Sequence, residues 1–127
     1  MSIKFYSNFE LALNRLRGFI NQGIKDDLDR AGVIQAFEFT FEQAWKAIQK
    51  KGKNEGVEIN SPKQAFTWAM GQKWISVNDE LMWLDLLNDR NLTTHAYRED
   101  VAKKVAQRTE TVYAKAFFSL LEKMKKE

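Results

Sequence analysis

Apolar residues recur at intervals of three and four along almost the whole chain, and this spacing restricts the possible fold more than any other feature. Between residues 5 and 24 the apolar positions of one face are Phe9, Leu13, Leu16 and Ile20. A helix has 3.6 residues per turn, so residues with this spacing lie on one side of it. No segment shows the sustained alternation that a half-buried strand requires. The sequence therefore predicts an all-α fold.

The second predicted helix, residues 27–51, has an apolar stripe formed by Ile34, Phe37, Phe41, Ala44 and Ile48. Lysines in its last turn are followed by Gly52, which predicts that the helix ends there. Phe39 and Trp45 lie off this stripe, so the helix is apolar on more than one face. Two interpretations remain open: the helix is central in its own bundle, or its second face is a homodimer interface.

A short third helix is predicted from the chain's single proline, Pro62, to about residue 74. Ser61 can accept a hydrogen bond from the backbone at the third helical position, and Gln64 can return one to the serine's own amide. Proline suits the first turn because no amide hydrogen is needed there. The segment "SPKQAF" therefore predicts a capping box.

Two more helices complete the chain. The fourth lies within "DELMWLDLLNDRNL", where leucines at 81, 84 and 87 share a face, and either Ser76 or Asn78 can cap it. The last is long, residues 99–126, with a stripe formed by Val101, Val105, Val112, Ala116 and Leu120. We expect these helices to form an antiparallel four-helix up-and-down bundle with one short extra helix, as a single domain over residues 1–127.

Charge and composition exclude several classes of protein. The 127 residues include 20 basic and 17 acidic side chains, and the net charge of +3 is too small to predict nucleic-acid binding by itself. Lysines gather at 46–53 and 123–126, where they either favour helix carboxyl ends or form a phosphate-facing patch. No apolar run is long enough for a membrane span and no leader peptide is evident, so a cytoplasmic location without membrane contact is expected. The absence of cysteine excludes disulfides, thiolate catalysis and cysteine-based metal sites.

The only histidine, His95, stands five residues after Arg90 and two before Tyr97. A guanidinium offers a fork of donors to a phosphate, and an imidazole, which titrates near neutral pH, can take the proton of a ribose 2′-hydroxyl. Full acid and base catalysis needs two titrating groups, so a second chain would have to supply the other histidine. From spacing alone, a histidine at a helix end, bonded to a neighbouring carbonyl, is the preferred interpretation of His95, and phosphate chemistry is the alternative. Thr93 and Thr94 are β-branched and predict that the helix loosens there.

Metal binding has weak support. Glu38 and Glu42 share a helical face and could in principle join His95, but one histidine and no cysteine make a zinc site a poor interpretation. Asp27 and Asp29 stand at a helix start, where carboxylates suit the helix dipole. We therefore expect neither a metal nor a cofactor.

Three blocks of the sequence together resemble a known family: "AFEFTFEQAWKAI" at 36–48, "SPKQAF" at 61–66 and "WLDLLNDRNLTTHAY" at 83–97. In this order and at this spacing they are similar to the nucleotidyltransferase substrate-binding proteins, which belong to the HEPN superfamily of helical bundles. The resemblance covers roughly residues 5–125.

The resemblance implies a partner and a site. The partner is a separate minimal nucleotidyltransferase in a toxin–antitoxin-like pair; Asp27 and Asp29 lack that enzyme's preceding Gly-Ser, so this chain is not the transferase. In similar HEPN toxins an R-x4-H-x-Y motif is a ribonuclease centre at a homodimer cleft, and the partner attaches AMP to the tyrosine. Carried over, Arg90 and His95 become catalytic, Asn91 and Thr94 join Tyr97 in binding RNA or a nucleotide, and Tyr97 is the possible modification site.

Overall fold

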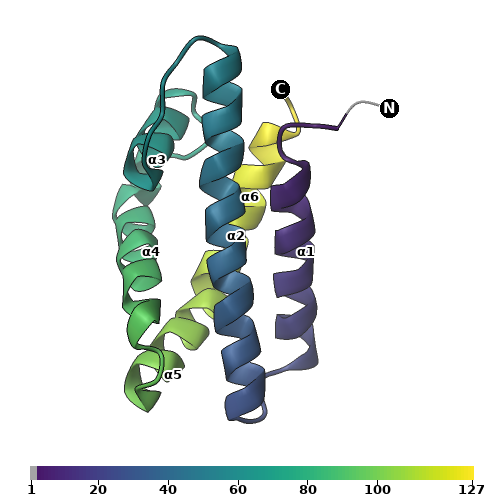
Figure 1. The fold of residues 1–127 in the computed structure, drawn as a ribbon, viewed down its shortest axis with the longest axis vertical. Helices are drawn as coiled ribbons and strands as arrows, with labels where there is room; N and C mark the ends of the chain where they lie inside the picture. The colour runs from purple at the N-terminus through teal and green to yellow at the C-terminus, as the bar shows by residue number, and fades with distance from the viewer. Residues whose placement is uncertain (1–2) are drawn as a thin grey trace.

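The computed structural model describes residues 3–127, and over this range the chain is helical and contains no strand (Figure 1). The elements are α1 (Ser7–Gln22), α2 (Asp27–Asn54), α3 (Pro62–Gly71), η1 (Val77–Asp79), α4 (Glu80–Leu92), η2 (Thr93–His95), α5 (Glu99–Arg108), η3 (Thr109–Tyr113) and α6 (Ala114–Met124). Of these, η1 and η2 are short 3-10 helices and η3 is a π-helical turn. The predicted all-α fold is confirmed.

Helix α2 runs through the middle of the molecule (Figure 1). Helix α1 lies antiparallel beside it on one flank, and α3 and α4 lie on the other. Helices α5 and α6 continue through η3 as one long rod that crosses behind α2, and the two ends of the chain lie near the same end of the molecule. Each long helix therefore has a face toward a shared interior, as the amphipathic spacing predicts.

Phe117 of α6 is the centre of the core and has no exposed surface. Its ring lies 6.0 Å from that of Phe9, 6.1 Å from that of Phe37 and 5.9 Å from that of Trp83, measured between centroids. These separations suit edge-to-face and tilted aromatic contacts, which add to the free energy gained by burial alone. One side chain thus links α1, α2, α4 and α6.

Helix α2 does not end at Gly52, as the sequence predicts, but at Asn54. A Cβ built on Gly52 would lie 2.7 Å from Ile59 Cδ1, so this glycine makes room for the chain that returns against the helix. The glycine in the left-handed region is Gly56, with φ 78°. The lysines and glycines do mark the end of α2, but the glycine of the turn that follows the helix is Gly56 rather than Gly52.

Helix α3 begins at Pro62 with Ser61 as its cap, as predicted. Ser61 Oγ accepts a hydrogen bond of 3.2 Å from the amide of Gln64. The Gln64 side chain, however, accepts its 2.8 Å bond from the amide of Asn60, one residue before the expected donor. Ser76 Oγ accepts from the amide of Asn78 and so caps η1, which precedes α4.

The predicted inner face of α4 is wrong. Leu81 is 76% exposed and Leu84 is 40% exposed, whereas Trp83, Leu86 and Asp89 are buried. The buried stripe contains the carboxylate of Asp89, so apolar spacing alone points to the leucines of the outer face instead.

On α2, Phe39 is 53% exposed, and the chain's own helices therefore cover only part of the second apolar face.

The predicted last helix is interrupted by η3. The amide of Ala114 bonds to the carbonyl of Thr109, five residues back, so this turn holds one residue more than an α-helical turn. Each residue advances a helix by about 100°, so the positions that follow are rotated by that amount. Val112 consequently lies 42% exposed although the stripe placed it inside, and Tyr113 is buried in its place.

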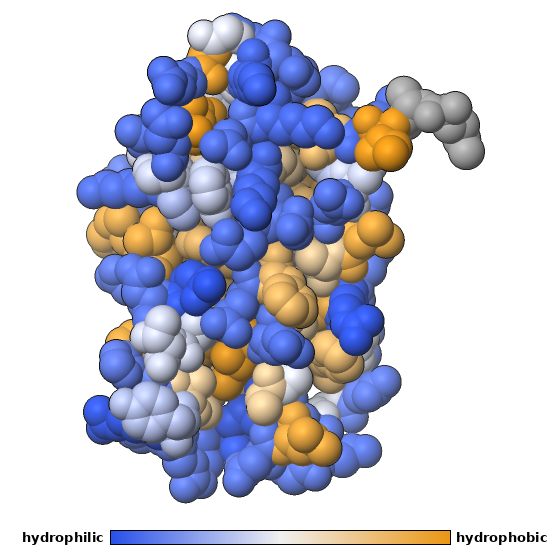
Figure 2. Space-filling view, viewed as in Figure 1, coloured by the Kyte–Doolittle hydropathy of each residue, from blue (hydrophilic) through white to orange (hydrophobic). Residues whose placement is uncertain are grey.

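Within the described residues, no helix is both long enough and apolar enough to cross a membrane. Figure 2 shows a largely hydrophilic face on which apolar side chains lie in several separate groups.

Helix α3 ends at Gly71, three residues before its predicted end, and the chain then turns at Lys73, whose φ is 66°. The amide of Lys73 bonds to the carbonyl of Met70, and the amide of Trp74 bonds to that of Ala69. These two bonds are the pattern of a helix end that usually has glycine in the left-handed position. A lysine therefore stands where its Cβ is strained.

We expect Lys73→Gly to raise the free energy of unfolding by roughly 0.5–1 kcal/mol, because glycine adopts this backbone conformation without strain. The measurement is urea denaturation followed by circular dichroism. Gln72→Gly is the control: Gln72 has an ordinary helical φ of −81°, so glycine there should lower stability. Equal effects of the two substitutions would contradict the strain at Lys73.

Candidate functional site

The motif residues lie where α4 gives way to η2, and the loosening predicted at the two threonines is confirmed. Helix α4 ends at Leu92 and the 3-10 turn η2 follows at once. The hydroxyl of Thr93 lies 2.7 Å from the carbonyl oxygen of Arg90 and 2.8 Å from Glu38 Oε2, two acceptors for its single proton. The hydroxyl of Thr94 donates to the carbonyl of Asn91 at 3.1 Å. Both threonine hydroxyls therefore lie against carbonyls of the last turn of α4.

Arg90 points from α4 toward two glutamates of α2. Its Nη1 lies 3.2 Å from Glu38 Oε2 and donates to the Thr93 hydroxyl at 2.9 Å. Its Nη2 lies 3.8 Å from Glu42 Oε1, too far for a hydrogen bond. Its Nε is buried and has no hydrogen-bond partner. Nη1 of the guanidinium thus has hydrogen-bond partners, whereas Nε and Nη2 have none among the described residues.

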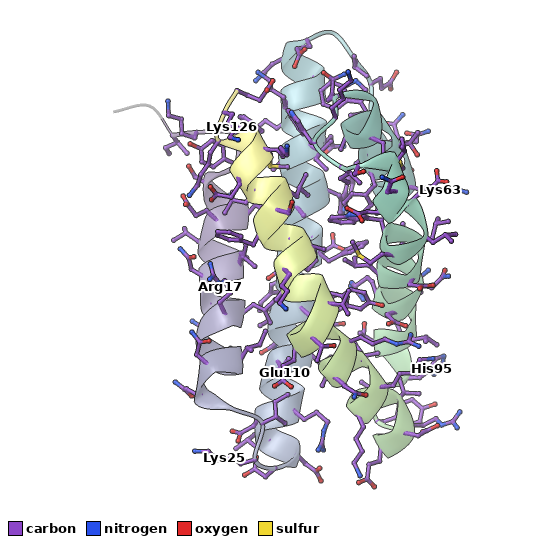
Figure 3. All side chains as sticks on the ribbon, turned by 180° about the vertical axis from the view of Figure 1, so that it is seen from behind. Arg17, Lys25, Lys63, His95, Glu110 and Lys126 are labelled. Carbon is purple, nitrogen blue, oxygen red and sulfur yellow. The ribbon has the colours of Figure 1, made fainter. Side chains whose placement is uncertain are left out.

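His95 and Tyr97 lie beside each other on the surface. The Nδ1 atom of His95 lies 3.3 Å from the hydroxyl oxygen of Tyr97, and Tyr97 is 80% exposed. Figure 3 shows His95 on the outer side of the molecule, near the lower end of α4. Among the residues that the structure describes, no hydrogen bond joins His95 to Arg90. The structure brings the histidine and the tyrosine together and leaves the arginine apart.

Four of the five residues predicted for this site border two different hollows. Tyr97 and Thr93 line one of about 510 Å³ together with Glu38, between α2 and the start of α5. Arg90, Asn91 and Thr94 line another of about 340 Å³ between α2, α3 and α4. The Arg90–Glu38 pair lies between the two hollows, and His95 lines neither of them. The five sequence-predicted residues therefore do not converge on one pocket within a single chain.

Next to Arg90 lies a buried polar cluster that the sequence interpretation missed. Asp89 is 2% exposed, and Nη1 of Arg108 lies 3.1 Å from its Oδ1 and 3.0 Å from its Oδ2. The hydroxyl of Tyr113 donates to Oδ2 at 2.5 Å. Burial, and then this hydrogen bond to Asp89, raise the pKa of Tyr113 well above its ordinary value. The signal in the sequence was the position of Asp89, three residues after the buried Leu86.

No group of three potential metal ligands occurs in the part of the chain that the structure describes. Glu38 and Glu42 are both turned toward Arg90. Asp27 pairs with Arg30 at 2.6 Å, and Asp29 accepts the amide of Lys25, as residues at a helix start do.

Residues 4–126 match the family described as nucleotidyltransferase substrate binding protein like. The chain belongs to this family. A crystal structure of a protein from Thermus thermophilus is similar to this substrate-binding family member, with 31% sequence identity and a TM-score of 0.82, covering 91% of this chain and 98% of the other. No protein with a curated description matches the sequence. The resemblance drawn from the three sequence blocks is therefore confirmed.

We expect Tyr113→Phe to lower the free energy of unfolding by about 1–2 kcal/mol at neutral pH, because Asp89 loses a buried hydrogen-bond donor. The parent should also lose stability as the pH rises above about 10, where the unfolded chain releases the tyrosine proton and the folded chain still holds it. The variant should lack this part of the decline. Chemical denaturation at several pH values measures both effects, and Tyr6→Phe is the control. Parallel curves for parent and Tyr113→Phe would contradict the prediction.

Proposed function

We propose that this chain is the HEPN-type subunit of a two-protein, toxin–antitoxin-like module and pairs with a separate minimal nucleotidyltransferase. The observation that carries the proposal is the match to the substrate-binding family over residues 4–126. A protein of this family would serve the transferase as a binding subunit, without having the transfer chemistry itself. Asp27 and Asp29 support the view that this chain lacks the transfer chemistry, because at a helix start Asp27 pairs with Arg30 and Asp29 accepts the amide of Lys25.

Tyr97 is the residue that such a partner would modify. Its side chain is 80% exposed, so another protein's active site can reach the phenol. His95, 3.3 Å from that oxygen, can accept its proton as the oxygen attacks the α-phosphorus of ATP. The new bond joins AMP to the tyrosine, and pyrophosphate leaves. The added anion would then lie directly over His95.

A homodimer of single-domain subunits, each with residues 1–127 in a four-helix up-and-down bundle, completes the proposal. In this arrangement α1, α2, α4 and the α5–α6 rod are the four members, and α3 is the short extra helix. The exposed Phe39 on α2 and the exposed leucines 81 and 84 on α4 are apolar positions that a second copy could cover. A dimer would also bring a second histidine to the site.

The proposal expects the neighbouring gene to encode a minimal nucleotidyltransferase, and co-expression with that protein should yield one complex on gel filtration. Addition of ATP and Mg²⁺ should then raise the intact mass of this chain by one AMP. Tyr97→Phe should retain the complex and remain unmodified, whereas Tyr6→Phe should behave as the parent. A chain that elutes alone as a monomer, with no transferase in its fractions, would refute the pairing.

A second function, metal-independent cleavage of RNA, is favoured by the exposed His95, which follows Arg90 by five residues at the same helix end. His95 would take the proton of a ribose 2′-hydroxyl, whose oxygen attacks the adjacent phosphorus while the 5′-oxygen departs, leaving a cyclic phosphate. Arg90 would stabilise the charge on the phosphate oxygens. Glu38 and Glu42 oppose this role because they surround the guanidinium with two negative charges.

If the chain cleaves RNA, the activity should persist in EDTA and fall by at least about 100-fold in His95→Ala, since general acid–base groups contribute about that much. Cleavage of a labelled RNA on a gel measures the rate. Gln107→Ala, an exposed position on α5, is the control. Intact RNA after prolonged incubation, or equal rates for parent and His95→Ala, would exclude this function. In that case a nucleotide-binding module without cleavage is the remaining alternative.

A further inference from the structure

A hollow of about 480 Å³ lies between the turn that follows α3, the start of α4 and helix α6. We name it the α4/α6 hollow. It shares no lining residue with the two hollows that border the motif residues. Its lining residue Lys123 stands three positions before Lys126, and Figure 3 shows Lys126 and His95 toward opposite ends of the molecule. The α4/α6 hollow is therefore separate from the motif.

The inner walls of the α4/α6 hollow are apolar and belong to the core. Trp74, Trp83 and Leu120 are buried, and Met70 and Met82 are half-buried and pack against the core. Tryptophan gives a large flat apolar surface, and methionine adapts to the shape of what lies against it. Small-molecule sites have volumes of about 300–1,000 Å³ and are lined mainly by such side chains. The hollow thus has the size and the walls of a ligand site.

Two indole N–H groups in these walls have no acceptor in the protein. Within residues 3–127 no hydrogen bond includes Nε1 of Trp74 or of Trp83, although both residues are at most 5% exposed. Neither nitrogen is fully covered, because in this range Nε of Arg90 is the only fully covered side-chain nitrogen or oxygen without a partner. A buried tryptophan usually finds a partner for its N–H. Since both residues line the hollow, we expect an acceptor bound there to receive at least one of them.

The rim of the α4/α6 hollow carries two lysines that no carboxylate pairs with. Lys73 comes from the turn after α3 and Lys123 from α6, and neither takes part in an ion pair within the described part of the chain. The nearby Lys125, by contrast, lies 2.6 Å from Glu10. One carboxylate, that of Asp79, also lines the hollow, so two lysines and one aspartate give a formal charge of +1. This charge favours a ligand with a single negative charge.

The backbone at Lys73 is strained, and its position at this rim gives the strain a purpose. Its φ of 66° lies in the left-handed region, where glycine would be unstrained. Residues held in such conformations concentrate at binding and active sites. Here the strained residue supplies one of the two positive charges of the hollow. A glycine would suit the turn better, but it would remove that charge.

We propose that the α4/α6 hollow binds a small monocarboxylic acid with an apolar body. The body lies against the tryptophan and methionine walls, and the carboxylate lies at the rim with Lys73 and Lys123. A carboxylate carries one negative charge at neutral pH, which matches the formal charge of the lining. The second charge of a phosphomonoester would face Asp79 with no third cation to balance it. This site goes beyond the proposed function, because it uses none of the motif residues.

The test titrates the full chain, labelled with ¹⁵N, with 4-phenylbutyrate and follows the indole N–H signals of its four tryptophans by NMR. Each signal is assigned by replacing one tryptophan with phenylalanine. The signals of Trp74 and Trp83 should shift and saturate, whereas the signal of Trp45, whose N–H donates to Glu42 at 3.1 Å, should stay in place. 4-Phenylbutanol, which has the same body without the charge, should bind more weakly.

Substitutions at the rim separate charge from fold. Lys123→Ala should weaken binding of 4-phenylbutyrate about threefold, the size expected for an ion pair at an exposed rim, and leave binding of 4-phenylbutanol unchanged. Lys73→Gly should have the same effect while it raises stability, so affinity and stability change in opposite directions. Asp79→Asn should strengthen binding of the acid about threefold. Lys115→Ala, which removes an exposed lysine of α6 that does not line the hollow, should change the affinity little.

Ser119 is an exposed residue of the lining, and Ser119→Trp should fill the hollow and abolish binding. Circular dichroism shows whether this variant is folded, and Ser119→Phe replaces it if it is not. The proposal is overturned if the signals of Trp74 and Trp83 stay in place or shift without saturation. Equal affinities for the acid and the alcohol, or equal effects of Lys115→Ala and Lys123→Ala, also overturn it. So does a folded variant at position 119 that binds the acid as the parent does.

Discussion

The buried carboxylate of Asp89 determines how α4 meets the α5–α6 rod. A charge removed from water is strongly unfavourable unless it is paired and hydrogen-bonded. Arg108 of α5 and Tyr113 of η3 supply that pairing from the opposite helix. Helix α4 cannot rotate about its axis without leaving this carboxylate unpaired. Together with the buried Trp83 and Leu86, this contact sets the direction of the side chains in the last turn of α4.

Arg90 follows Asp89 in the chain and therefore points about 100° away from it, toward α2. There it lies between the two hollows rather than inside either. This placement accounts for the separation of the motif within one chain: Arg90 with Asn91 and Thr94 on one side, and Thr93 with Tyr97 on the other. The arginine and the histidine of the motif belong to adjacent surfaces of one helix end.

Much of this fold could be predicted from the sequence, because helices with one buried face show their period directly. The cap at Ser61 and the break at Thr93 were also predictable, since hydroxyl side chains bind free helix-end groups in recognisable positions. The inner face of α4 could not be found from apolar spacing, because Asp89 occupies one of its buried positions. The orientation of Arg90 depends on its ion pairs with Glu38 and Glu42 of α2, far earlier in the chain, and spacing within a motif carries no information about them.

The π turn at Thr109–Tyr113 shifts the helical phase of α6 relative to that of α5. Both α5 and α6 have the α-helical period, but the buried positions of α6 are shifted by one residue from those that a continuous α-helix from α5 would give. A relative that has a plain α-helix here would need one residue fewer to present the same core. An ungapped alignment of two such proteins would match α5 correctly and then pair core residues of α6 with surface residues of the other chain. The turn would thus make two nearly identical folds look unrelated over their final helix.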